Sequence, residues 1–87
     1  MRNEFFDIPV TIETARVGRL RVVSSASEAA SLLVDSWPEG KSGPKHHGAL
    51  KACMDVLEQR KAVSAARKAF VAAAVEADIF VREGRLS

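Results

Sequence analysis

The chain has 87 residues, a hydrophobic content of 47% and a formal net charge of +2, which argue against intrinsic disorder and against a strongly basic nucleic-acid-binding protein. This length fits one domain over residues 1–87. The single cysteine, Cys53, excludes an internal disulfide, and no stretch approaches the ~20 apolar residues of a membrane span. We therefore expect a cytoplasmic protein that does not enter a membrane.

Two segments near the N-terminus alternate with the period of a β-strand. In residues 6–14 the apolar face is expected to contain Phe6, Ile8, Val10 and Ile12. Because Pro9 lacks an N–H group, this segment is expected to be an edge strand. Residues 19–24 alternate again, with Leu20 and Val22 on the expected inner face. The short link ending at Gly18 predicts a β-hairpin over about residues 6–24.

A first helix is expected over about residues 26–37. Ser25 and Glu28 have the spacing of a capping box, in which each side chain bonds the backbone N–H of the other residue. Pro38 disfavours a helical conformation at Trp37 and therefore ends the helix. The expected inner face contains Ala26, Ala29, Ala30, Leu33 and Trp37.

Two further helices are predicted at about residues 44–58 and 63–77. Pro44 suits a first helical turn, where its missing N–H costs nothing. The expected buried positions are Ala49, Leu50, Cys53, Val56 and Leu57, followed by Val63, Ala66, Phe70, Ala73 and Ala77. Residues 79–81 could form a final turn or a strand, and the tail 82–87 is expected to fray.

These elements predict an α+β fold in the order ββααα, with an antiparallel hairpin packed on three helices. A two-stranded sheet is marginally stable by itself. Helix contacts or pairing with a second copy are therefore expected to complete it. Pro9 hinders edge pairing through the first strand, which leaves the second strand as the expected dimer edge.

The order of residues in the second half of the chain resembles a known family. The pattern comprises Trp37, Ala49 to Cys53, Leu57, Ala66 to Ala74, Glu76, Ala77 and Ile79. It is similar to the domain of unknown function 982, a family of small proteins of rhizobia and related alphaproteobacteria, over roughly residues 6 to 81. The resemblance implies no activity. Members often have glycine where this chain has Asp78, a position that suits a left-handed helix stop.

No set of residues has the spacing of a catalytic or metal site. His46, His47 and Cys53 provide at most three ligands, and Cys53 lies on the apolar stripe, where it is expected to act as a small hydrophobe. Gly40-Lys41-Ser42 lacks the upstream glycine and the preceding strand of a phosphate loop. Trp37 is expected to fill the core and to bond a loop carbonyl. No catalytic residue, metal or cofactor is therefore predicted, and the chain is not expected to be an enzyme.

A basic cluster marks the start of the second helix. It contains Lys41, Ser42, Lys45, His46, His47 and Lys51, with no acidic residue between Glu39 and Asp55. Free N–H groups at a helix start and nearby cations favour anions. A phosphate-bearing ligand or an acidic partner is therefore a candidate for this loop.

Arg16, Arg19 and Arg21 mark the expected outward face of the hairpin, and such a basic ribbon can enter a DNA groove or can simply be kept soluble by its charge. The leading expectation for function is a binding or regulatory module that contacts an unknown protein partner. The alternative is a weak anion or nucleic-acid binder that uses residues 41–51.

Overall fold

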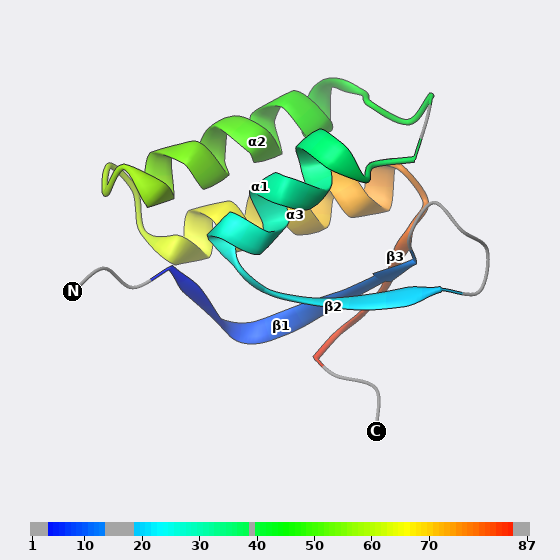
Figure 1. Cartoon of the computed structure of the whole chain (residues 1–87), viewed down its shortest axis with the longest axis horizontal. Coiled ribbons are helices and arrows are strands. Elements are labelled where there is room, and N and C mark those ends of the chain that lie inside the picture. The colour runs from blue at the N-terminus through cyan, green and yellow to red at the C-terminus, as the bar shows by residue number, and fades with distance from the viewer. Residues whose placement is uncertain (1–3, 14–18, 39, 85–87) are drawn as a thin grey trace.

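The computed structural model describes residues 4–13, 19–38 and 40–84. In these residues one antiparallel sheet of three strands is covered on one face by three helices (Figure 1). The elements in chain order are β1 (Phe5–Glu13), β2 (Leu20–Ser25), α1 (Ala26–Asp35), α2 (Pro44–Leu57), α3 (Val63–Glu76) and β3 (Phe80–Glu83). The α+β class is confirmed, and a third strand extends the expected order to ββαααβ.

Strand β3 changes the place of β1 in the sheet. The strand order is β2-β1-β3, so β1 is central and the expectation of an edge strand was wrong. Pro9 is tolerated because the β1–β2 register shifts between Phe5 and Val10, and Pro9 still accepts a hydrogen bond from the Gly84 N–H at 2.6 Å. Arg82 and Glu83, expected to fray, pair with β1.

The burial of side chains along β1 and β2 differs from the expected pattern at several positions. Ile8 lies in the shifted segment and is 51% exposed, whereas Val10 and Ile12 are buried as expected. In β2 the expected face was wrong by one residue. Val23 pairs with Val10 and is fully buried, while Leu20 is 44% exposed.

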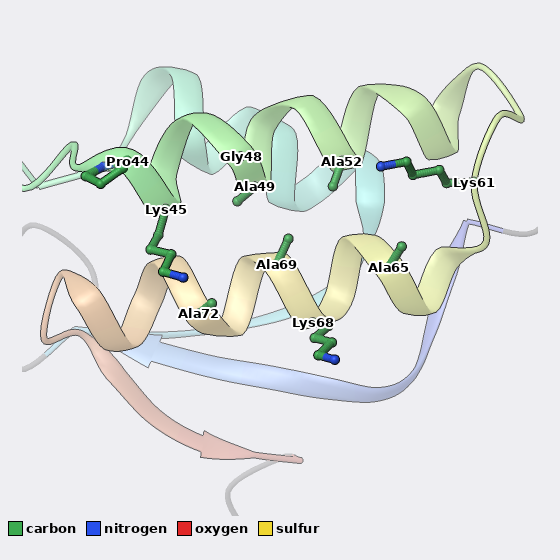
Figure 2. A pocket seen from close by; sticks show the side chains of 10 residues that line it. All are labelled: Pro44, Lys45, Gly48, Ala49, Ala52, Lys61, Ala65, Lys68, Ala69 and Ala72. Atoms are coloured by element: carbon green, nitrogen blue, oxygen red, sulfur yellow. The ribbon is translucent and has the colours of Figure 1, made fainter.

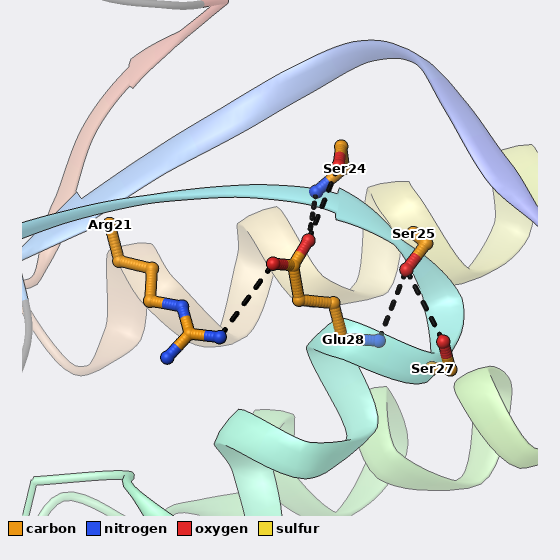
Figure 3. A network of polar contacts seen from close by, with 5 residues as sticks. All are labelled: Arg21, Ser24, Ser25, Ser27 and Glu28. Atoms are coloured by element: carbon orange, nitrogen blue, oxygen red, sulfur yellow. Dashed lines mark hydrogen bonds and ion pairs between the residues drawn. The ribbon is translucent and has the colours of Figure 1, made fainter.

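The turn from β2 into α1 is held by a modified capping box (Figure 3). The Ser25 hydroxyl accepts from the Glu28 N–H at 3.2 Å, as expected. The Glu28 carboxylate accepts instead from the Ser24 N–H at 2.8 Å, one residue before the expected donor. It also lies 3.7 Å from Arg21. Arg21 therefore lies on the helix side of β2 and does not form part of an outward basic face, while Arg16 and the expected turn at 15–18 lie outside the described residues.

Helices α2 and α3 both end in a left-handed residue. Gln59 has φ +63° and Asp78 has φ +61°. In each case the next N–H reaches back into the helix, from Arg60 to the Asp55 carbonyl at 2.7 Å and from Ile79 to the Ala74 carbonyl at 2.9 Å. These are Schellman turns, and Asp78 takes the conformation for which glycine is the usual choice. Helix α1 ends at Asp35, two residues before the expected end.

The core lies between the helices and the sheet. Its largest fully buried side chains include Phe70, Ile12 and Leu33. The α2–α3 pair is the most extensive contact between elements, and α1 packs mainly on α2. None of the helices in the described ranges is both long and apolar enough to cross a bilayer.

Candidate functional site

The basic cluster predicted at the start of α2 does not converge on one point. Lys41, Ser42, Lys45, His47 and Lys51 are exposed. His46, the remaining member, is half-buried and points into the protein.

His46 belongs to the packing between α1 and α2. Its Nε2 lies 2.7 Å from the Leu33 carbonyl oxygen, and because a carbonyl can only accept, Nε2 carries the proton. The His46 ring lies 5.5 Å from the Trp37 ring, which also meets Phe70 edge-on at 5.8 Å. Trp37 Nε1 donates to the Lys41 carbonyl at 3.1 Å, which confirms the expected bond to a loop carbonyl.

The N-terminus of α2 already has a carboxylate beside it. Oε1 of Glu76, at the end of α3, accepts from the Lys45 backbone N–H at 3.1 Å. The carboxylate comes so close that a Cβ at Gly43 would lie 2.5 Å from Oε1. An acidic group in this place satisfies a free donor and complements the helix dipole. Local sequence patterns do not reveal this cap, because Glu76 follows Lys45 by 31 residues.

The surface beside this cap has mixed charge. A shallow depression of about 320 Å³ is lined by Lys41, Ser42, Glu76 and Asp78, together with neighbouring backbone. The expected anion site therefore contains two carboxylates that only the tertiary structure brings there. An anion bound at this helix end would have to compete with Glu76.

Cys53 is fully buried, and burial raises the pKa of its thiol from 9.0 to about 11. At neutral pH the group is a neutral thiol, whereas a nucleophile or a metal ligand needs the thiolate. Among the residues that the structure describes, no three His, Cys, Asp or Glu side chains are grouped to hold a metal ion.

A second, larger depression is a groove between α2 and α3, with a volume of about 420 Å³ (Figure 2). Most of its lining residues have small side chains or none. They are Pro44, Gly48, Ala49 and Ala52 from α2, and Ala65, Ala69 and Ala72 from α3. Lys45, Lys61 and Lys68 complete the lining. We call this feature the α2–α3 groove.

The lysines surround the α2–α3 groove without filling it. Figure 2 shows Lys45 extending from α2 toward Ala72, Lys61 extending back along the end of α2, and Lys68 projecting from the side of α3 that is turned away from α2. Lys61 lies 3.7 Å from Asp55. Neither Lys45 nor Lys68 has a side-chain ion pair within the described residues. The floor is therefore apolar and the rim is positive.

Of the predicted cluster, only Lys45 lines this groove. The signal that could have found it is the spacing of small residues. Gly48 and Ala52 are four apart, and Ala65, Ala69 and Ala72 are separated by four and three residues, so each set lies on one helical face. Alanine at such positions is compatible both with close packing and with an open groove. The spacing alone therefore does not predict the groove, which depends on how α2 and α3 lie together.

Comparisons with known proteins bear on the family alone. Searches of curated proteins and of solved structures gave no match. The model of the family described as "Protein of unknown function (DUF982)" matches residues 8–81. This range contains α1, α2, α3 and most of the sheet. The chain therefore belongs to the DUF982 family of proteins of unknown function.

Proposed function

We propose that this protein is a non-enzymatic binding module that acts through contact with another protein. The observation that supports this function is the α2–α3 groove, which has a volume of about 420 Å³, an apolar floor and a positive rim. Concave apolar surfaces with few polar groups at their edge are typical of recognition sites. The buried thiol of Cys53 is protonated at neutral pH, which does not favour a role as a nucleophile. The carboxylate of Glu76 beside the basic cluster does not favour an anion site.

Photo-crosslinking tests this function directly. Val75 follows Ala72 by one turn on α3 and is 58% exposed, so a benzoylphenylalanine there would lie beside the groove without entering the core. Val34 on α1 is 65% exposed and provides the matched control. We expect irradiation in host cells to give a discrete crosslinked product from position 75 and none from position 34.

A third variant shows whether the crosslink depends on the groove. Ala69→Leu adds bulk to the groove floor, so it should abolish the product when combined with the probe at Val75. Equal products from both probe positions, or no product from either, would contradict binding through this surface.

The alternative function is weak binding of anions or nucleic acid by residues 41–51. Exposed Lys41, Lys45 and Lys51 support it, while the carboxylate of Glu76 at the helix start opposes it. Glu76→Gln removes the competing charge. Under this alternative, phosphate should shift the backbone amides of residues 43–48 more strongly in the variant than in the unmodified protein. A gel shift with short DNA should weaken steeply as salt rises. Amides that do not move in either protein would exclude this alternative.

A further inference from the structure

We propose that the α2–α3 groove binds an acidic amphipathic helix of a partner protein. This inference rests on the proposed binding function and names the chemistry of the partner. It follows from the shape of the groove, the sign of its rim and the repulsion expected between two copies.

The shape of the groove suits a helix. Its floor is formed by two rows of small residues, with Gly48 and Ala52 on one side and Ala65, Ala69 and Ala72 on the other (Figure 2). Small residues let a third helix approach closely, and side chains of that helix can fill the space between the rows. From Ala65 to Ala72 the floor is about 10 Å long at the helical rise of ~1.5 Å per residue. Two turns of a partner helix, with apolar anchors at i, i+3 or i+4, and i+7, match this length.

The rim determines the expected charge of the partner. Lys45 and Lys61 lie at the two ends of the groove, and Lys68 lies along its α3 side. Among the described residues, none that lines the groove is acidic. A helix with Asp or Glu beside its apolar stripe would place these groups against the lysines, as complementary interfaces do.

The same charges disfavour a second copy of this chain as the occupant. In a two-fold dimer each surface meets its own equivalent. Pairing through the α2–α3 groove would therefore bring Lys45, Lys61 and Lys68 toward the same three residues of the other copy. Like charges at an interface are costly.

The test selects binders without assuming their charge. A display library of amphipathic helical peptides with a fixed apolar stripe would carry Glu, Lys and Gln with equal frequency at the flanking positions. Selection against the full chain should enrich Glu. In an NMR titration, a selected peptide should shift the amides of Ala65, Ala69 and Ala72. A proline in the middle of the peptide should abolish binding, because it breaks the helix.

Charge reversal provides the matched control. Lys45→Glu combined with Lys68→Glu should weaken a selected acidic peptide by about tenfold or more, since each contact at an exposed site contributes a modest amount. Lys41→Glu with Lys51→Glu makes the same change in net charge away from the groove and should leave its affinity within about twofold. Selection of neutral or basic peptides, or no selected binder, would overturn the proposal. So would displacement of the selected peptide by the short-chain anionic lipid dihexanoyl-phosphatidylglycerol at equal concentration, since a lipid would then be the better occupant.

These outcomes separate the inference from the proposed function. A crosslinked partner at Val75 together with neutral selected peptides would retain a binding module and reject an acidic helix. No crosslink and no selected peptide would reject both.

Discussion

Helices α2 and α3 present two sides that are packed differently. The inner side, toward α1 and the sheet, contains Cys53, Ala66 and Phe70, all with no exposed surface. The outer side contains Ala65 and Ala69, which are half-buried, and leaves a groove of about 420 Å³ between the helices. Both sides are built from apolar residues, so hydrophobicity does not distinguish them.

The difference lies in what faces the small residues. On the inner side, Phe70 and the rings of Trp37 and His46 occupy the space that alanines leave. On the outer side, no large apolar side chain lines the groove among the residues that the structure describes, and its long side chains are the lysines Lys45, Lys61 and Lys68 at the rim. The same residue type therefore permits dense packing on one side and leaves room for a partner on the other. Substitutions on the two sides should separate folding from binding.

The largest expected effect is at Phe70. Phe70→Ala removes a fully buried ring and its edge contact with Trp37 at 5.8 Å, so we expect a loss of about 3–5 kcal/mol in the free energy of unfolding. Urea denaturation followed by the fluorescence of Trp37 measures it. Val75→Ala, on the outer side of the same helix, should change stability by less than about 0.5 kcal/mol. Similar losses for both would show that the outer side also contributes to the core.

Burial of Cys53 on the inner side should appear in the dependence of stability on pH. The pKa of its thiol is about 11 in the folded protein, against an ordinary value of 9.0. The folded state therefore keeps its proton where the unfolded state loses it. The contribution of this thiol to the free energy of unfolding is fully present below pH 9. It is lost, by about 2–3 kcal/mol, as pH rises through the folded pKa of about 11.

The measurement for Cys53 compares urea denaturation curves at several pH values with those of Cys53→Ala. Lysines also titrate in this range, so the difference between the two proteins isolates the thiol. An unchanged difference from pH 8 to pH 11 would show that the thiol is accessible to water.

A pair of alanine substitutions compares the two sides most directly. Ala66→Leu adds three carbons to a fully buried site and should cost about 1–3 kcal/mol through overpacking. Ala69→Leu adds the same atoms at the groove, where there is room, and should cost less than about 0.5 kcal/mol. Thermal unfolding measures both. An equal cost would mean that the groove closes in solution.

Local patterns predicted most of the fold. The spacing of Ala49, Cys53 and Val56 and that of Ala66 and Phe70 identified both helices and their buried faces. For residues 79–81 a strand and a final turn both stayed open, and the pairing of Arg82 and Glu83 was not predicted, because Phe80–Glu83 has only four residues in which to show an alternation. Its pairing depends on the turn at Asp78, which directs the chain back to β1.

The site was harder to predict than the fold, for a physical reason. A helix start rich in lysine and histidine indicates an anion site only while no carboxylate lies beside it, and Glu76 reaches it from α3. The groove likewise exists only after α2 and α3 have packed. Both features depend on contacts between residues far apart in the chain, which local periodicity does not report.

The smallest expected effect on stability is at the turn that follows α2, away from both the inner side and the groove side of the helices. Gln59 holds φ at +63°, a conformation that costs a residue with a Cβ more than it costs glycine. Gln59→Gly should therefore raise the free energy of unfolding by about 0.5–1 kcal/mol, even though glycine also loosens the unfolded chain.

Glu58 is the matched control for this change, since its φ of −91° is available to every residue. Glu58→Gly should gain nothing and should lose up to about 1 kcal/mol. In urea the difference between the two variants should appear as a midpoint shift on the order of 1 M, given a slope of about 1 kcal/mol/M for a small protein. Equal midpoints would show that the turn after α2 is not strained.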